Sequence, residues 1–451
     1  MSAGGIRVLQ ATAWYPPYDM GGTEVYLEGL TGELRTLGVE SSVIVPRGTG
    51  ASEAYVHAGT PVETYPVNEI PAPDEMRDGR PHLQFSEFQA RLAAQRGAIY
   101  HQHSWSRGCG PHHLHAAREL GFTTVLTVHV PGTICIRGTM LRYGTRSCDG
   151  RVEERYCGAC WAQGRGMPRA LASAVARLPL SIALRARRGR TRAATALAAR
   201  VLGAEQRAQL GEMIRNADWV VAVCGWLHDA LAANGVPPER LVLSRQGVTA
   251  AFLQAAQKAA ATSGYSGKGP LKLLYVGRWH PVKGIDIVVR AVRALPAETS
   301  VQLSLHAVPG TAEEATYEEM VRRLAEGDRR IKFAPPLPRG ELAVTMARHN
   351  ALVVPSVWLE TGPLVVLEAQ AAGLYVMGSR LGGIAELVGE YAGGELVETG
   401  SVRAWTAAIE RLAERHASGA LVCRPREVRT MAAAAAEMAE LYNSLVRHRG
   451  S

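Results

Sequence analysis

The chain has 451 residues, of which 47% are hydrophobic, so it is long enough for two or three domains with buried cores. No run of eighteen or more uncharged apolar residues occurs, and the N-terminal segment lacks a charged start followed by a long apolar stretch. We therefore expect a soluble, cytoplasmic protein with neither a transmembrane helix nor a secretory signal. The net charge of +9 does not by itself choose among nucleic acid, anionic lipid and phosphorylated substrates as partners.

The first fifty residues predict the opening of a parallel sheet. An apolar run at 6–11 is typical of a buried strand, and Gly21 and Gly22 follow in a loop. Leucines then recur at helical spacing and stop at Gly38, a residue suited to the position just after a helix. The next apolar run, at 42–45, predicts a second strand. This order of strand, loop, helix and strand is typical of a Rossmann-like domain.

The rest of the N-terminal half continues this pattern, although residues 47–97 are less regular. Apolar segments predict strands at 98–103, 123–129, 218–224 and 241–244, with a helix near 114–120. Two histidines, His103 and His129, stand at the ends of predicted strands. In open α/β sheets these ends border the ligand site, so both are candidates for binding, with a purely structural role as the alternative for each.

An insertion at residues 131–215 interrupts this first domain. It contains four of the seven cysteines, namely Cys135, Cys148, Cys157 and Cys160. The last two form a Cys-x-x-Cys pair that could hold Zn²⁺ in a tight turn, and four thiolates would close a structural tetrahedral site. Disulfide pairing and free thiols stay open as alternatives, and we assign no catalytic role to these residues.

The insertion also carries most of the excess positive charge. Its arginines alternate with Leu, Val and Ile and are almost unopposed by acids, which suits an amphipathic helix docked on the inner face of a membrane as well as a solvated helical hairpin. Nucleic acid is disfavoured as a partner because the run lacks interleaved aromatics and a recognition motif. The arginines are Arg165, Arg169, Arg177, Arg185, Arg187, Arg188, Arg190, Arg192 and Arg200.

The C-terminal half predicts a second Rossmann-like domain. Small and polar residues at 254–270 suggest a linker, after which the alternation of strands and helices restarts. We expect an N-terminal domain at 1–262, a C-terminal domain at 270–424, and a final segment, 425–451, that contains a long Ala-rich helix. The expected strands are 273–276, 301–307, 331–334, 351–354 and 375–377, with helices at 285–295 and 364–372.

The most specific motif lies between Ser356 and Val388. Glu360 precedes a predicted helix and Glu368 lies two turns inside it. Thr361 or Gly362 could cap this helix, and Pro363 and Leu364 would open its first turn. Backbone N–H groups at such a helix start can hold a phosphate, and a carboxylate on the helix can accept hydrogen bonds from ribose hydroxyls.

Two further elements suit a diphosphate ligand. The segment after the strand at 273–276 places Arg278 and Lys283 in a loop that opens a helix, where both cations could contact one diphosphate. The Gly21-Gly22 loop lets backbone approach a ligand closely. A glycine pair at Gly382-Gly383 forms a similar turn. Each feature alone could be a plain turn or a solvated charge.

In this order the motifs resemble those of a family 4 glycosyltransferase of the GT-B superfamily, over most of the chain and most strongly at 273–388. The resemblance rests on the paired glutamates, the two cations, both glycine turns and His129 after the strand at 123–128. It implies an α/β GT-B fold, with two Rossmann-like domains that face a central cleft. The N-terminal domain would bind the acceptor, the C-terminal domain would bind the nucleotide, and the last helix would pack back on the first domain.

The resemblance also implies retaining transfer from a nucleoside diphosphate sugar without a catalytic metal. His129, Glu360, Arg278 and Lys283 would be the catalytic residues, and Glu368 would hold the ribose. Many members have Phe-Gly after the first glutamate. This chain has Thr361-Gly362-Pro363 there, which leaves the donor sugar open. The remaining donor-binding residues would be Gly21, Gly22, Thr361, Gly362, Pro363 and Leu364.

Other functions are disfavoured by the residues that they would need. A nucleotide-sugar epimerase would need carboxylates placed to activate water, and a phosphorylase would need a cofactor lysine, and neither is evident. A non-catalytic scaffold is disfavoured because both glutamates and both cations are intact. A dehydrogenase is disfavoured because no G-x-G-x-x-G follows the first strand. Donor base, sugar, acceptor and pathway, including polysaccharide or glycolipid synthesis, cannot be chosen from the sequence.

Overall fold

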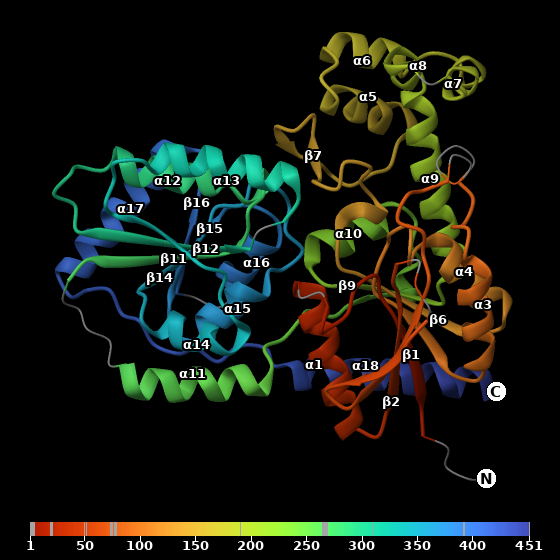
Figure 1. Ribbon diagram of the computed structural model, residues 1–451, viewed down its shortest axis with the longest axis horizontal. Coiled ribbons are helices and arrows are strands. Elements are labelled where there is room, and N and C mark those ends of the chain that lie inside the picture. Colours follow the sequence, from red (N-terminus) through yellow and green to blue (C-terminus); the bar gives the residue numbers. More distant parts are fainter. Residues whose placement is uncertain are drawn as a thin grey trace. The chain divides into compact units, whose positions relative to one another are not determined.

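The computed structural model describes most of the chain as two compact units (Figure 1). Unit 1 comprises Met1–Arg245 and Met431–Ser451, and unit 2 comprises Gln246–Thr430. The described residues are 5–18, 21–48, 50, 52–72, 75, 79–189, 191–263, 269–308, 310–390 and 393–450.

Unit 1 is built on an eight-stranded sheet in the order β10-β9-β6-β5-β1-β2-β4-β3. Neighbouring strands run parallel except for the antiparallel pair β3 and β4. The central strands are almost wholly buried, as expected for a parallel sheet covered on both faces. The strands are β1 (Arg7–Ala11), β2 (Glu40–Pro46), β3 (Ala54–His57), β4 (Thr60–Tyr65), β5 (Ile99–Gln102), β6 (Thr123–Val128), β9 (Trp219–Ala222) and β10 (Leu241–Leu243).

The helices of unit 1 follow the predicted periodicity. In the first, α1, leucines 27, 30 and 34 are buried, and Gly38 just beyond the helix has a φ of 76°, the left-handed conformation expected there. The last helix of the chain, α18, packs against α1. The helices that flank the sheet are α1 (Gly22–Thr36), α3 (Phe85–Ala94), α4 (Pro111–Glu119), α10 (Gly225–Ala233) and α18 (Met431–Gly450).

The insertion folds as a small hairpin followed by helices. Figure 1 shows α6, α7 and α8 grouped near one end of the long helix α9. A small cluster of buried alanines with Val175 packs α5, α6 and the start of α9 together. The elements are β7 (Leu141–Arg142), β8 (Arg146–Ser147), α5 (Glu154–Gly164), α6 (Arg169–Val175), α7 (Leu180–Arg187), α8 (Arg192–Leu197) and α9 (Ala199–Asn216). Residue 190 and the side chain of Arg192 lie outside the described part.

Unit 2 contains a wholly parallel six-stranded sheet in the order β13-β12-β11-β14-β15-β16. Helices lie on both faces, with α12 and α13 on one side and α11 and α14 on the other (Figure 1). The strands are β11 (Leu271–Arg278), β12 (Val301–Val308), β13 (Ile331–Ala334), β14 (Ala351–Val354), β15 (Tyr375–Ser379) and β16 (Gly394–Val397). The helices are α11 (Ala250–Ser263), α12 (Ile285–Ala294), α13 (Ala312–Ala325), α14 (Arg339–Ala347), α15 (Leu364–Ala371), α16 (Gly382–Glu390) and α17 (Val402–Ala417).

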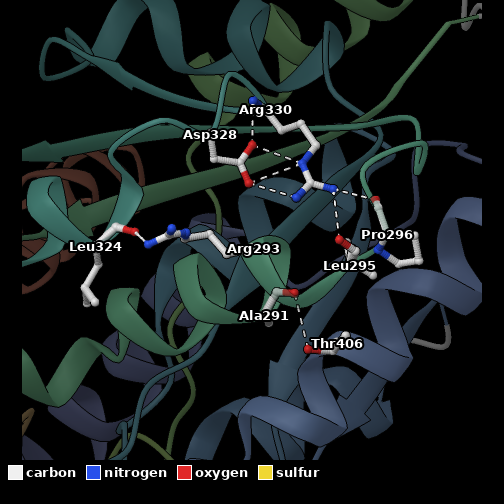
Figure 2. Close-up of polar contacts among 8 residues, drawn as sticks. All are labelled: Ala291, Arg293, Leu295, Pro296, Leu324, Asp328, Arg330 and Thr406. Carbon is white, nitrogen blue, oxygen red and sulfur yellow. Dashed lines mark hydrogen bonds and ion pairs between the residues drawn. The ribbon is translucent and has the colours of Figure 1, made fainter.

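Polar contacts join the helices of unit 2 to the connections between strands (Figure 2). Arg330 pairs with Asp328 at 2.8 Å and donates to the carbonyl of Pro296, also at 2.8 Å. Arg293 donates to the carbonyl of Leu324, and the Thr406 hydroxyl donates to the carbonyl of Ala291 at 3.2 Å. These bonds anchor α12 against α13 and α17 and leave the opposite, carboxyl-terminal edge of the sheet to the site loops.

The α/β class and the two Rossmann-like sheets are confirmed, and one prediction is wrong. The segment expected to be a linker, 254–270, is helical through Ser263 in α11, which packs on α14 and α15. Its alanines and Phe252 allow an amphipathic helix that composition alone does not distinguish from a flexible tether. Residues 264–268 of the predicted linker lie outside the described part. In the part that is described, no helix combines the length and apolarity needed to cross a bilayer.

Candidate functional site

The last residue of β11, Arg278, and the loop that follows it, which carries Lys283, lie at the carboxyl edge of the unit 2 sheet. His280 accepts a hydrogen bond from the N–H of Val282 at 3.2 Å and so caps a single 3₁₀ turn. Gly284 ends this turn with a φ of 66°, and a Cβ there would lie 2.2 Å from the carbonyl oxygen of Pro355. Glycine at this position therefore lets the β11 and β14 loops approach closely.

The loop after β14 carries Glu360, which the structure brings together with Lys283. The Lys283 Nζ lies 2.7 Å from Glu360 Oε1, and the Ser356 hydroxyl donates to the same oxygen at 2.7 Å. The N–H of Val357 donates to the carbonyl of Val282 at 2.8 Å and joins the two loops. Burial alone would raise the pKa of Glu360, but Lys283 and Ser356 lower it below its usual value, so the carboxylate stays ionised.

A third loop, after β15, completes this arrangement. The N–H of Gly383 donates to the carbonyl of Glu360 at 2.7 Å. A Cβ on Gly383 would lie 2.5 Å from the backbone nitrogen of Gly362, which explains the glycine pair at Gly382-Gly383. Three successive loops at one sheet edge therefore fix the position of a single buried carboxylate.

The start of α15 differs in detail from the expectation. Pro363 is the residue before the helix, with ψ of 120°, rather than part of its first turn, and neither Thr361 nor Gly362 caps it. Gly362 has a φ of 111°, a conformation that favours glycine, so this residue serves the loop and not the helix end. Leu364 begins the helix. The predicted helix is confirmed, and its predicted cap is wrong.

Glu368 is buried in α15, one turn after its first residue, Leu364, and not two turns inside the helix as predicted. Burial raises the pKa of its carboxyl to about 7, and Arg339 offsets only part of this effect. At neutral pH this side chain is therefore poised between its acid and its carboxylate. A hydrogen-bond donor placed next to it would favour the carboxylate.

Arg278 is not joined to this cluster. Its side chain is 59% exposed, and its nearest acid is Glu314 at 3.9 Å. Glu314 is in turn held in the capping box that starts α13 with Thr311. The structure thus places Lys283 and Glu360 together and leaves the Arg278 guanidinium at the surface beside α13.

In unit 1 the Gly21-Gly22 turn opens α1. The N–H of Gly21 donates to Glu24 Oε2 at 2.8 Å, so that this glutamate closes the helix start. Among the described residues, which exclude 19 and 20, a Cβ on Gly22 would meet no atom within 4 Å. Such a helix start suits the approach of an anion or a sugar.

His129 and His103 of unit 1 lie next to each other, close to α1. Their Nε2 and Nδ1 atoms are 3.1 Å apart, and the ring of Tyr26 from α1 lies 5.0 Å from the His129 ring. Burial lowers the pKa of His129 to about 3 and that of His103 well below its usual value. Both imidazoles are therefore neutral at physiological pH.

Several residues of these clusters were not singled out from the sequence. In unit 2 this is Ser356, and in unit 1 the missed residues are Gln10, His101 and Tyr442, which bond to one another and to His103. The alternation of His101 and His103 along one strand was a usable signal. Tyr442 gave none, because its partners lie more than 300 positions earlier in the chain.

The four cysteines of the insertion come from its loop, its hairpin and the first turns of α5. Cys160 Sγ accepts from the N–H of Tyr143 at 3.2 Å. None of the seven cysteines, all of which are described, forms a disulfide. Within the described ranges no group of three or more His, Cys, Asp or Glu side chains is arranged to hold a metal ion. The four thiols nevertheless lie near one another, since, besides burial, Cys135, Cys148 and Cys160 each contribute to raising the pKa of Cys157. The zinc site stays a prediction that metal analysis of the purified protein would test.

Comparison with known families matches each half of the chain. A family model described as Glycosyltransferase Family 4 matches residues 20–162, and one described as Glycosyl transferases group 1 matches residues 262–421. Among curated relatives, the D-inositol 3-phosphate glycosyltransferase of Corynebacterium glutamicum is 32% identical over 38% of this chain and 43% of its own length. That of Kineococcus radiotolerans is 31% identical over 56% of this chain and 62% of its own length. The matches thus span about half the length of these relatives.

Solved structures show the same fold over nearly the whole chain. The sucrose-phosphate synthase of Thermosynechococcus elongatus has a TM-score of 0.63 at 20% identity and covers 98% of this chain and 100% of its own. The Anabaena Alr3699/HepE protein in complex with UDP and glucose has a TM-score of 0.57 at 14% identity and covers 99% of this chain and 98% of its own. The shared fold agrees with the two family models, and together they identify the family of this chain. It belongs to the family 4 glycosyltransferases, and it shares the fold of these solved structures.

Proposed function

We propose that this protein transfers a glycosyl group from a nucleoside diphosphate sugar to an acceptor hydroxyl, with retention of anomeric configuration. The observation that carries this proposal is the Lys283–Glu360 pair at the carboxyl edge of the unit 2 sheet, 2.7 Å apart and largely buried. A cation and an ionised carboxylate at the place where open α/β sheets bind ligands suit an anionic, hydroxyl-rich donor.

The residues of unit 2 would divide the donor between them. Lys283 and Arg278 would bind the diphosphate, with the backbone from Thr361 to Leu364 at the start of α15. Glu360 would orient hydroxyls of the donor sugar. Glu368 would accept hydrogen bonds from the ribose, since its buried carboxyl has few charges to stabilise it otherwise. On this proposal Arg278 leaves Glu314 and moves to the phosphate when the donor binds.

The chemistry follows from where charge develops. As the bond between the sugar C1 and the diphosphate oxygen breaks, negative charge grows on the phosphate. Lys283, Arg278 and backbone N–H groups would stabilise that charge by preorganised electrostatics. The acceptor oxygen then bonds to C1 on the face that the diphosphate leaves. The proton of the acceptor hydroxyl passes to the departing phosphate oxygen, so the step needs no side-chain base.

Unit 1 would supply the remaining contacts. We assign the Gly21-Gly22 turn and His129 to the donor sugar and the acceptor, because the start of α1 and the buried histidine pair lie at one edge of the unit 1 sheet. The curated relatives are named for inositol 3-phosphate, and a structural neighbour from Burkholderia xenovorans is a trehalose-phosphate synthase in complex with glucose-6-phosphate. These names favour a small polyhydroxy acceptor over a lipid-linked glycan.

A thermal-shift screen of nucleoside diphosphates and their sugars tests this proposal. A nucleotide that binds the folded state raises the melting temperature by mass action, so a rise with one base would name the donor. Incubation of that donor with candidate acceptors, followed by product analysis, would separate transfer from epimerisation and phosphorolysis. A folded protein that responds to none of the sugar nucleotides would contradict the proposal.

We also propose peripheral contact of the insertion with an anionic membrane surface. Helices α6 to α8, which pack on one another, carry apolar side chains that are 36% to 53% exposed, and a group of exposed apolar residues can mark an interaction surface. The sequence from 155 to 204 contains no Asp or Glu, and several of its arginines are exposed beside these side chains. The exposed apolar residues are Leu171, Leu180, Ile182, Leu184 and Leu197.

Liposome co-sedimentation tests this contact. Replacement of Arg177, Arg185 and Arg188 by Gln should abolish binding to vesicles that contain anionic lipid. The matched control replaces three arginines of unit 2 by Gln, because each of those pairs with an acid one turn away and is already compensated. The controls are Arg290, Arg322 and Arg323. Absence of binding by the unaltered protein at low salt, or equal loss in both variants, would overturn the proposal.

A further inference from the structure

Five buried polar side chains form one continuous network on a face of the unit 1 sheet. Strand register sets Gln10 of β1 beside His101 of β5, and the N–H of His103 donates to the carbonyl of Ala11 at 2.8 Å. Thr127 and His129 occupy alternate positions along β6 and its end. Since alternate residues share a face of a sheet, all five point the same way. Gln10, His101, His103 and Thr127 are at most 1% exposed, and His129 is 5% exposed.

The C-terminal helix contributes the sixth member of this network. The hydroxyl of Tyr442 on α18 is fully buried and lies 2.5 Å from His101 Nδ1 and 3.5 Å from Gln10 Nε2. On its far side His101 Nε2 lies 2.7 Å from the Thr127 hydroxyl. Burial strongly raises the pKa of Tyr442, so this hydroxyl keeps its proton and donates it.

The orientation of one carboxamide sets the direction of every bond. Gln10 directs Nε2, which can only donate, at the Tyr442 oxygen, and Oε1, which can only accept, at His103 Nε2, 2.8 Å away. His103 must therefore carry its proton on Nε2. Because His103 is neutral, its Nδ1 is a lone-pair acceptor, and the partner at 3.1 Å, His129 Nε2, has to donate to it.

We propose that Gln10, oriented by Tyr442, fixes His129 through His103 in the tautomer that carries its proton on Nε2. Gln10, His103 and Tyr442 are positioning residues, since they act on His129 and not on substrate. A neutral histidine of this tautomer presents Nδ1 as an acceptor, whereas the other tautomer would present a donor there. The part of this inference that concerns catalysis rests on the proposed function. There, Nδ1 of His129 would accept a hydrogen bond from a sugar hydroxyl and so select a hydroxyl at that position.

The tautomer can be measured directly on the full chain by long-range ¹H–¹⁵N correlation of histidine-labelled protein, with His129→Asn to assign the signal. Wild-type protein should show an unprotonated Nδ1 and a protonated Nε2 at His129. Tyr442→Phe removes the acceptor that orients Gln10, so both carboxamide orientations become populated and the His129 signals should move toward a mixture. Tyr100→Phe is the control, because Tyr100 is equally buried in unit 1 but its hydroxyl bonds to Gln102.

Activity gives the second readout. If both tautomers become equally populated in Tyr442→Phe, kcat should fall by about twofold or more, while nucleoside diphosphate affinity stays unchanged because unit 2 binds the nucleotide. A protonated Nδ1 in wild-type protein, or equal effects of Tyr442→Phe and Tyr100→Phe on the tautomer, would overturn the inference. The predicted tautomer in a protein that binds no nucleoside diphosphate would instead overturn the proposed function and leave the inference standing.

Discussion

The polar clusters of the two units differ in the kind of interaction that holds their side chains in place. In unit 1 the buried groups are neutral and are held by a chain of hydrogen bonds from Thr127 to His129. In unit 2 the central contact is an ion pair, Lys283–Glu360, and backbone hydrogen bonds among three neighbouring loops hold it in place. Both clusters lie at the carboxyl edge of a parallel sheet. The comparison shows that sheets of the same kind can preorganise polar side chains in two ways, through hydrogen bonds between neutral groups or through an ion pair.

The two designs respond differently to protons. In unit 1, burial lowers the pKa of His129 to about 3, so this side chain stays neutral at physiological pH. In unit 2, the pKa of Glu360 is lowered, whereas burial raises the pKa of Glu368 to about 7. The pKa values of the two glutamates shift in opposite directions because their charged partners differ. Glu360 has a cation in contact, and Glu368 has only the more distant Arg339. The following predictions test these contrasts, from the largest expected effect to the smallest.

Replacement of Lys283 by Ala should have the largest effect. It leaves the buried carboxylate of Glu360 uncompensated, so the free energy of unfolding should fall by about 3–5 kcal/mol. Turnover should fall by about 100-fold, or ~2.7 kcal/mol of transition-state stabilisation. Denaturant unfolding and steady-state kinetics measure the two effects.

The double variant Lys283→Ala with Glu360→Gln separates these effects. Removal of the unpaired charge should restore most of the stability, and the activity should stay low. A single Lys283→Ala variant as stable as wild type would show that the pair is solvated and not structural.

Replacement of Glu368 by Gln should alter stability in a pH-dependent way. The folded pKa is raised, so the stabilising contribution of this carboxyl is present below pH 4.5 and is lost as pH rises through 7. The glutamine variant does not incur this loss. Relative to wild type it should gain on the order of 3 kcal/mol between pH 4 and pH 8. Denaturant unfolding at both values measures this gain, and a difference that does not change with pH would contradict the buried-acid assignment.

The contribution of His129 to the free energy of unfolding should change with pH in the direction opposite to that of Glu368. The folded pKa of His129 is lowered to about 3, so its contribution to stability is present above pH 6.5 and is lost as pH falls below that value. Compared with His129→Asn, wild-type protein should lose about 1.6 kcal/mol in total as pH falls from 6.5 to 5. Parallel denaturation curves for the two proteins over this interval would show that His129 is not buried and neutral.

Replacement of Arg278 by Ala should have the smallest effect. Its side chain is largely exposed, so stability should change by less than about 0.5 kcal/mol. If the guanidinium reaches the diphosphate only when donor is bound, turnover should still fall about tenfold, or ~1.4 kcal/mol. Near-normal turnover would remove Arg278 from the donor site and leave Lys283 as the proposed phosphate cation.

The fold was predictable because its signals are local. Apolar runs flanked by helical periodicity predicted β1, β5, β6 and β11 close to their observed bounds. The glycine at position 38 predicted the end of α1. The segment at 254–270 was misread because small polar residues suit a linker and a solvent-facing helix alike. Only the packing of α11 on α14 and α15 distinguishes them.

The charged residues of the candidate site could be predicted from the sequence, whereas most contacts between its neutral side chains could not. The spacing of Glu360 and Glu368 and the cations after β11 stood out in the sequence. That Lys283, and not Arg278, pairs with Glu360 depends on how two loops meet over Gly284, which sequence spacing does not reveal. His103 and His129 were singled out at strand ends, but their link to Gln10 and Tyr442 was not predicted, since such contacts become recognisable only when strands and helices are placed side by side.

The central claim is that the Lys283–Glu360 pair marks a diphosphate site, and titration calorimetry tests it most directly. The nucleoside diphosphate that the thermal-shift screen selects should bind wild-type protein and bind Lys283→Ala at least about tenfold more weakly, or ~1.4 kcal/mol. The matching nucleoside without phosphates should bind both proteins equally. Equal diphosphate affinity in a folded Lys283→Ala variant would contradict the account.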